Sequence, residues 1–118
     1  MMKYIYIAGP ISKGDQFLNV RKAIDAAHEV SLMGLIPFIP HQNFLWHMFH
    51  PKPYEVWMDY DFDWIRRCDA LLRIPGENSG SDREVAFASK LGLPIFLSLD
   101  QLRGHLDGLK KLEARVRL

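Results

Sequence analysis

The stretch Tyr4-Ile5-Tyr6-Ile7-Ala8-Gly9-Pro10, near the start of the 118-residue chain, predicts how the fold begins. Its β-branched and aromatic residues favour a strand, and Gly9-Pro10 ends that strand. A polar turn follows, after which residues 15–33 carry apolar side chains at helical spacing, with Gly34 placed to end the helix. The segment therefore predicts the strand, loop and helix with which a parallel α/β sheet begins.

The rest of the chain repeats this alternation. Apolar runs at residues 35–39, 70–74 and 94–97 predict three more strands, and Pro37 suits the first of these to a sheet edge. Residues 54–67, 81–91 and the stretch from Leu99 predict helices, and residues 40–53 predict an ordered loop or lid. We expect one domain over residues 1–118, a three-layer α/β fold with a doubly wound parallel sheet of four to five strands. Such sheets bind ligands at the carboxyl ends of their strands, here the loops 9–14 and 75–80.

The composition excludes several classes of protein. With 48% hydrophobic residues and a formal net charge of +1, the chain resembles neither a disordered protein nor one that binds nucleic-acid polymers, so a small-molecule partner is expected. Its one cysteine, Cys68, allows no internal disulfide and no Cys-rich zinc site, and is expected in the core. No apolar run approaches about 18 residues and no signal peptide is evident, which predicts a soluble cytoplasmic protein without membrane contact.

Glu84 is the first candidate for chemistry. The run Ser81-Asp82-Arg83-Glu84 opens the predicted helix 81–91 and fits a capping box, with Ser81 as N-cap and Glu84 as its partner. Glu84 also shares a helical stripe with Ala88 and Leu91, which would turn its carboxylate toward the sheet. The positive end of the helix dipole would keep that carboxylate ionised, as a nucleophile requires. Both interpretations stand at this point.

Asp61 is the second unusual carboxylate. The predicted helix 54–67 places it on one stripe with Trp57, Trp64 and Ile65, although an acid on an apolar stripe is unfavourable unless it is paired or used. Burial would raise its pKa and let it act as a general acid, whereas the alternative is an aspartate hydrogen-bonded to nearby backbone. Two carboxylates in different environments are what glycosidic cleavage requires.

Three motifs resemble one family. Residues 6–12, 61–70 and 80–86 are similar to the successive motifs of the nucleoside 2-deoxyribosyltransferases and of the related 2'-deoxynucleoside 5'-phosphate N-hydrolases, and the resemblance runs from about Met2 to Leu97. It implies a flavodoxin-like fold and a covalent glycosyl intermediate on Glu84. It also implies that Asp61 assists the leaving base and that Tyr6 positions the nucleophile. No cofactor is implied, and a homo-oligomer is expected because relatives complete their sites in oligomers.

The substrate-binding prediction combines this resemblance with residue chemistry. The loop 9–14 resembles the family's sugar or 5'-phosphate contact, and Ser12 and Lys13 suit a phosphate, whereas Asp15 opposes an anion. Since hydrolase relatives offer an arginine where this chain has Ser12, the requirement for a 5'-phosphate stays open. The predicted substrate-binding residues are Gly9, Pro10, Ile11, Ser12, Lys13, His41, Gln42, Trp57, Asn78, Gly80 and Ser81.

The aromatic segment 40–53 contains three histidines, His41, His47 and His50, in a spacing that matches no zinc site, so no metal is predicted. Polar side chains there could bind a base edge, and aromatic rings could stack on the base, or the segment could pack against a neighbouring subunit. The residues concerned are His41, Gln42 and Asn43 for the edge, and Phe44, Trp46 and Trp57 for stacking.

The sequence thus predicts cleavage of the N-glycosidic bond of a (deoxy)nucleoside or nucleotide, followed by base exchange or hydrolysis. A 2'-deoxy sugar suits an oxocarbenium-like transition state. The alternative is a non-catalytic nucleotide-binding or interaction module on the same fold, in which Glu84 only caps a helix. A different phosphate-handling enzyme is disfavoured because no GxxxxGK[ST] loop is present.

Overall fold

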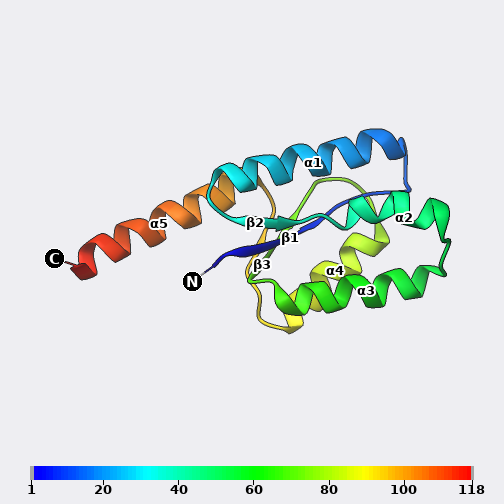
Figure 1. The fold of residues 1–118 in the computed structure, drawn as a ribbon. Helices are drawn as coiled ribbons and strands as arrows, with labels where there is room; N and C mark the ends of the chain where they lie inside the picture. The colour runs from blue at the N-terminus through cyan, green and yellow to red at the C-terminus, as the bar shows by residue number, and fades with distance from the viewer. Residues whose placement is uncertain (1, 118) are drawn as a thin grey trace.

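The computed structural model describes residues 2–117 and contains one sheet of four parallel strands (Figure 1). The strands are β1 (Tyr4–Ala8), β2 (Ile36–Phe38), β3 (Ala70–Arg73) and β4 (Ile95–Phe96), in the spatial order β2-β1-β3-β4. In β1, Ile5 pairs with Pro37 on one side and with Ala70 on the other. The predicted doubly wound parallel sheet is confirmed, and Pro37 lies on an edge strand as expected.

Helices cover both faces of this sheet. They are α1 (Gln16–Leu32), α2 (Asn43–Phe49), α3 (Tyr54–Arg67), α4 (Ser79–Lys90) and α5 (Leu99–Arg117), with a 3-10 helix η1 at Pro40–Gln42. Strand alternation sends Ile5 and Ile7 into the core beneath α1 and α5, and Tyr6 and Ala8 into the core beneath α3 and α4. Tyr6 therefore lies fully buried on the α3 and α4 side, which is also the side of the candidate site.

The α1 helix illustrates how the local sequence sets its bounds. The Asp15 side chain caps the helix, because its Oδ1 accepts a hydrogen bond from the Leu18 backbone N–H at 3.1 Å. Gly34 follows the helix at a φ of 83°, a conformation that glycine adopts without strain. Asp15 is thus engaged with backbone at the start of α1.

Two features differ from the sequence prediction, and the predicted last helix from Leu99 is confirmed. The segment 40–53 is not a plain loop, since η1 and α2 occupy most of it. The α4 helix begins at Ser79 rather than Ser81, because Asn78 is its N-cap. The α5 helix is longer than its packing requires: Leu102 is buried, but the helix continues away from the body (Figure 1). None of the helices within residues 2–117 has the length and apolar character needed to cross a bilayer.

Candidate active site

The site lies where the loops after β1 and β3 meet, at the carboxyl ends of two adjacent strands. From β1 the chain crosses toward β2, and from β3 it crosses toward β4, so the strand order reverses between them, as in ligand-binding crevices of doubly wound sheets. The two loops are in close contact: a Cβ on Gly76 would lie 2.7 Å from Pro10 Cγ, and one on Gly9 would lie 3.0 Å from Ile74 Cβ. Glycine at these positions lets the loops approach each other.

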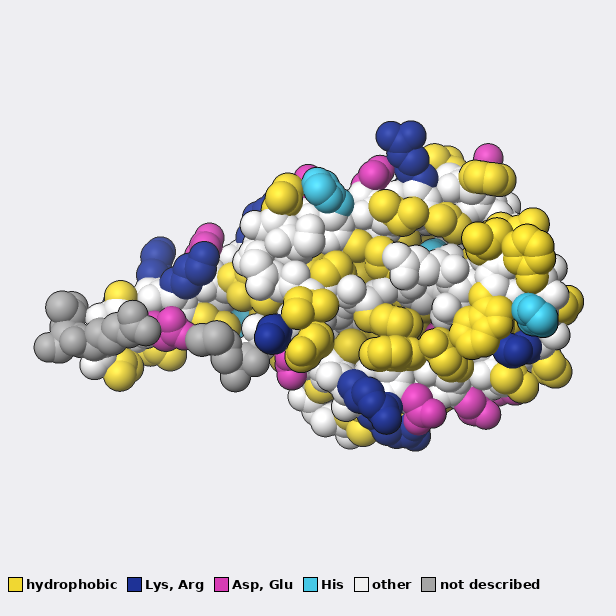
Figure 2. Space-filling model, viewed as in Figure 1, with side chains coloured by type: hydrophobic (Ala, Val, Ile, Leu, Met, Phe, Trp, Pro, Cys, Tyr) yellow, Lys and Arg dark blue, Asp and Glu magenta, His cyan; other side chains and the backbone are white. Residues whose placement is uncertain are grey.

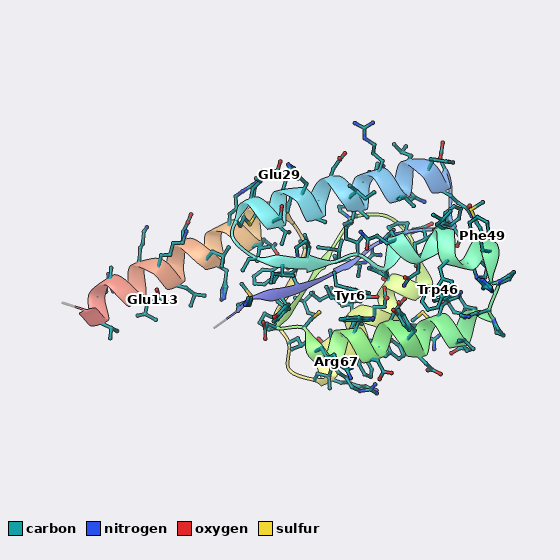
Figure 3. All side chains as sticks on the ribbon, viewed as in Figure 1. Tyr6, Glu29, Trp46, Phe49, Arg67 and Glu113 are labelled. Carbon is teal, nitrogen blue, oxygen red and sulfur yellow. The ribbon has the colours of Figure 1, made fainter. Side chains whose placement is uncertain are left out.

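Three side chains from three elements converge at the floor of this crevice. The Tyr6 hydroxyl of β1 donates a short hydrogen bond to Glu84 Oε2 of α4, and the Asp61 carboxyl of α3 lies within hydrogen-bonding reach of both groups. All three are buried, with Glu84 5% and Asp61 8% exposed. Figure 3 shows Tyr6 in the interior between β1 and α3. The three residues predicted as catalytic are therefore in contact.

Burial determines the protonation of this cluster. Removal from water raises the pKa of Glu84 and of Asp61 above the ordinary carboxyl range, and the nearby Asp61 charge raises the pKa of Glu84 further. Two buried carboxyls in contact cannot both ionise, so they share a proton near neutral pH. The expectation that burial raises the pKa of Asp61 is confirmed. The expectation that the helix dipole keeps Glu84 ionised is wrong, because Glu84 lies more than one turn inside α4, where desolvation prevails.

The capping interpretation of Glu84 is also wrong. Asn78 Oδ1 accepts a hydrogen bond from the Ser81 backbone N–H at 2.8 Å and lies 3.2 Å from the Ser81 hydroxyl, so Asn78 serves as the cap. Glu84 hydrogen-bonds to Tyr6 instead of to a helix terminus. Its orientation toward the sheet is consequently a feature of the site and not of helix capping.

Arg73, at the end of β3, holds part of the loop before α4. Its guanidinium donates to the carbonyl oxygens of Ile74 and of Gly76, and it lies 3.4 Å from an Asp82 carboxylate oxygen. The Arg73 side chain thus holds the first half of the loop 74–78 and connects it to α4. Arg73 is only 13% exposed, so its positive charge also acts on Glu84, whose pKa it lowers against the larger effect of burial.

A cavity of about 340 Å³ opens above the two carboxyls. Eight of the predicted site residues line it: Gly9, Ile11, Ser12, Trp57, Asp61, Asn78, Gly80 and Glu84. Eight further residues complete its lining: Gln16, Pro40, Asn43, Phe44, His47, Lys52, Tyr54 and Met58. Tyr54 and Met58 lie seven and three residues before Asp61 on the same helical stripe. Extending the stripe from Asp61 toward the start of the helix would have predicted both as lining residues. Gly80 must be small here, since a Cβ would lie 2.8 Å from the Tyr54 hydroxyl.

Other predicted binding residues lie around the cavity rather than in its lining. His41 is 1% exposed, and its Nε2 lies 3.1 Å from the carbonyl oxygens of Gly9 and of Pro10, so it fastens the loop after β1. Burial lowers the pKa of His41, which keeps the ring neutral. Lys13 forms an exposed ion pair with Glu77 at 2.8 Å, beside a separate cleft that Pro10 also lines. Gln42 is exposed, and Ser81 is buried against the α4 cap.

Aromatic residues of α2 and α3 form the outer wall. Trp46 packs edge-on against Trp57 and Tyr60, with ring centroids 5.1 and 5.7 Å apart, and Figure 3 places Trp46 between these helices. Of the three rings predicted to stack on a base, Phe44 and Trp57 line the cavity, while Trp46 supports Trp57. Within residues 2–117, no group of three or more His, Cys, Asp or Glu side chains is arranged to hold a metal ion.

Comparison with known proteins confirms the fold. The model is similar to the solved 2-desoxiribosyltransferase from Leishmania mexicana, with a TM-score of 0.59 and 24% identity over 79% of this chain and 61% of that one. It is also similar to the 2-deoxyribosyltransferase from the psychrotolerant bacterium Bacillus psychrosaccharolyticus, with a TM-score of 0.57 and 24% identity over 78% of this chain and 69% of that one. The chain thus spans about three fifths of the length of the Leishmania enzyme. No curated protein matches the sequence. A family model covers residues 3–97, and on that match the chain belongs to DUF4406, a family described as a domain of unknown function.

Proposed function

We propose that this chain cleaves the N-glycosidic bond of a deoxynucleoside or deoxynucleotide, with Glu84 as the nucleophile. The observation that carries the proposal is the contact between two buried carboxyls and the Tyr6 hydroxyl at the floor of a cavity. The volume of about 340 Å³ lies within the range of roughly 300–1,000 Å³ that is usual for small-molecule sites. The fold shared with two 2-deoxyribosyltransferases agrees with this chemistry.

In the first step, a carboxylate oxygen of Glu84 attacks C1' of the sugar, and the bond between C1' and the base nitrogen breaks. The electron pair of that bond leaves on the base, and Asp61 supplies the proton that neutralises it. The pair of acids holds the one proton this step needs, and the Tyr6 hydroxyl stabilises the charge on Glu84 by hydrogen bonding. The product is a glycosyl ester on Glu84 with the free base beside it.

In the second step, the ester is resolved by attack at C1'. Either another base nitrogen or a water molecule forms the new bond, and Glu84 leaves as a carboxylate. Asp61, now ionised, accepts the proton that the incoming nucleophile loses. Base exchange and hydrolysis thus use the same residues and differ only in the nucleophile. A 2'-deoxy sugar suits both steps, because a 2'-hydroxyl would withdraw electrons from the oxocarbenium-like transition state.

The test is a panel of deoxynucleosides and their 5'-phosphates, scored for released base with and without an acceptor base. We expect release in at least one case, loss of turnover in Glu84→Gln and a large decrease in Asp61→Asn. The matched control is Asp63→Asn, an exposed acid on the same helix, which should leave turnover unchanged. A 2'-fluoro substrate should add the mass of its sugar to the peptide that contains Glu84, since fluorine slows breakdown of the ester. No turnover across the panel, or full activity in Glu84→Gln, would reject the proposal.

We also infer that the chain self-associates through α2. Leu45, Met48 and Phe49 of this short helix are 61%, 62% and 73% exposed, which is unusual for large apolar side chains on one element. Figure 2 shows hydrophobic side chains gathered over this end of the molecule. Because α2 also forms a wall of the cavity, a second copy bound there would cover the mouth of the site. Sedimentation velocity should detect an oligomer that Met48→Ser and Phe49→Ser dissociate, and a monomeric parent protein would contradict the inference.

A further inference from the structure

One part of the cavity lining carries hydrogen-bond donors. Three of its residues are polar and come from α2 and the segment that follows it: Asn43, His47 and Lys52, here called the donor wall. The only acids in the cavity lining, Asp61 and Glu84, lie at its floor. The cavity is therefore divided between an acidic floor and a donor wall, and its occupant must match both.

The neighbours of His47 fix its tautomer. Its Nδ1 accepts a hydrogen bond from Trp57 Nε1 at 2.7 Å, and a second, longer one from the Lys52 backbone N–H at 3.3 Å. A ring nitrogen that accepts carries no proton, so the proton of the neutral ring is on Nε2. His47 can therefore only donate through its remaining nitrogen.

Lys52 adds a positive charge that no acid neutralises. Its Nζ lies 5.1 Å from the centroid of the Trp46 ring and 5.8 Å from that of Trp57, within the range of a cation–π contact. Among residues 2–117, Lys52 forms no ion pair with a carboxylate within 4.0 Å. The ammonium is thus held by two aromatic faces while its N–H donors stay available to an acceptor on a ligand.

Asn43 contributes an unsatisfied donor. Its Nδ2 is buried and has no hydrogen-bond partner within the described part of the chain. A buried donor without an acceptor is unfavourable, which favours an acceptor group close to Asn43. All three members of the donor wall consequently favour a ligand edge that carries acceptors.

The spacing of these groups matches a nucleoside held with its sugar at the floor. Trp57 precedes Asp61 by four residues on α3, which is about 6 Å along the helix axis. A sugar with C1' at Glu84 would extend its base toward the Trp57 ring, with Phe44 and Met58 nearby in the lining. The flat base would then present its outer edge to His47 and Lys52.

We propose that the donor wall selects bases with a carbonyl group at this edge and rejects those with an amino group in its place. This rests on the proposed function, and it names the substrate class of the same site. Guanine and hypoxanthine present two acceptors, O6 and N7, and thymine and uracil present O4. Adenine and cytosine instead present the amino donors N6 and N4, which would face an ammonium and an N–H. The substrates are accordingly oxo-base nucleosides or nucleotides.

A phosphate group is the other ligand with this acceptor chemistry, but the surroundings favour a base. Phe44, Trp57 and Met58 of the same lining are aromatic or apolar, and they suit a flat ring better than a hydrated dianion. The start of α4, at Asn78 and Gly80, lines another part of the cavity. A phosphate seated on Lys52 would give a different result in the experiment below.

The experiment compares substrate pairs that differ only at this position: deoxyinosine with deoxyadenosine, and deoxyuridine with deoxycytidine. We expect kcat/KM to be about tenfold or more higher for the oxo member of each pair, since one matched donor–acceptor contact discriminates by roughly that factor. Lys52→Met keeps the apolar stem on the tryptophan rings but removes the charge, and should reduce both ratios at least threefold. Lys111→Met, on the exposed face of α5, should leave them unchanged.

Equal rates for the two members of each pair would overturn the proposal, and so would ratios that survive Lys52→Met. The proposal would also fail if Lys52→Met lowered kcat/KM for nucleotides relative to nucleosides and left base selectivity intact, because Lys52 would then bind a phosphate. Titration of Glu84→Gln with free hypoxanthine and adenine separates this idea from the proposed function. Selective binding of hypoxanthine without turnover of any substrate would reject the proposed cleavage reaction and support the proposed base selectivity. Turnover together with unselective binding of the two bases would support the cleavage reaction and reject the base selectivity.

Discussion

The pair of buried carboxyls should make the fold less stable as the pH rises, and Glu84→Gln should remove the part of that dependence that Glu84 contributes. The native pair keeps a proton that an unfolded chain would release, because burial raises the pKa of Asp61 from 3.8 to about 7 and raises that of Glu84 as well. Where the native state binds more protons than the unfolded state, the free energy of unfolding falls with pH. The contribution is complete below about pH 4 and is lost as the pH rises through the raised pKa values, of about 7 for Asp61 and about 8 for Glu84.

The size of the effect follows from the width of this window. Holding the Glu84 proton while its pKa is raised from 4.5 to about 8 corresponds to roughly 5 kcal/mol at about 1.36 kcal/mol for each pH unit, an upper estimate for a pair that retains some contact with water. Glutamine has nearly the same shape as glutamate, can accept from Tyr6 and can donate to Asp61, so it fills the site without competing for a proton. Between pH 5 and pH 8 the free energy of unfolding of Glu84→Gln should therefore fall by less than that of the parent protein, with a difference of up to a few kcal/mol.

Urea unfolding of both proteins from pH 5 to pH 8.5 measures this difference directly. His41 acts in the opposite sense, because burial lowers its pKa and its contribution grows as the pH rises toward neutrality, but it is common to both proteins and cancels. The exposed variant Asp63→Asn serves as the control and should keep the pH dependence of the parent. If the free energy of unfolding of Glu84→Gln falls as much between pH 5 and pH 8 as that of the parent, Glu84 does not hold a buried proton and the reasoning is wrong.

Three further predictions concern single residues of the site. Tyr6→Phe removes a hydrogen bond to a charged group, which is worth about 1.5–3 kcal/mol, so kcat/KM at pH 7 should fall about tenfold to a hundredfold. The acidic limb of the pH profile of kcat/KM should also move to higher pH. A pH profile that does not move would contradict the proposed role of Tyr6. Asn78→Ala removes the α4 cap and should lower the free energy of urea unfolding by about 1 kcal/mol, while Asn78→Asp should retain most of it. In Gly76→Ala the added Cβ must adopt a φ of 134° and would contact the Pro10 ring, so this variant should lose thermal stability. The loss should exceed that of the control Gly14→Ala, where the φ is also positive but no atom lies within 4 Å. Equal losses in the two variants would show that the contact between Gly76 and Pro10 is unimportant.

The sequence predicted the layers of the fold because long periodic segments carry a strong signal. The helix 54–67 has the predicted bounds, since its apolar stripe runs over nearly four turns and the helix ends next to the strand at Ala70. The edge position of β2 followed from Pro37, which cannot donate to a second neighbouring strand. Strand alternation then placed Tyr6 on the same side of the sheet as α3 and α4.

Elements that depend on distant contacts were not predicted. The α2 helix has seven residues and no side-chain N-cap, so its local sequence signal is weak. It is held in place by packing of Trp46 against Trp57 of α3 and by the hydrogen bond that Trp57 donates to His47. The start of α4 was placed two residues late because Asn78 and Ser81 are both good N-caps, and only the structure distinguishes them. Of the donor wall, Asn43 was predicted to bind a base edge, but Lys52 was missed, because it faces the cavity through tertiary contacts that no short pattern encodes.

The position of Glu84 within α4 explains why three separate motifs are needed. A carboxylate at the first turn would be ionised by the helix terminus alone, but a buried one in the second turn has no such support. Its charge can form only with the Tyr6 hydroxyl on one side and a proton on Asp61 on the other, so strand, helix and loop must all be in place. In the transition state, positive charge develops at C1' of the proposed substrate. The Glu84 carboxylate then faces an opposite charge in a site that excludes water, which offsets the unfavourable free energy of burying its own charge. The same desolvation that destabilises the empty site would therefore strengthen binding of the transition state.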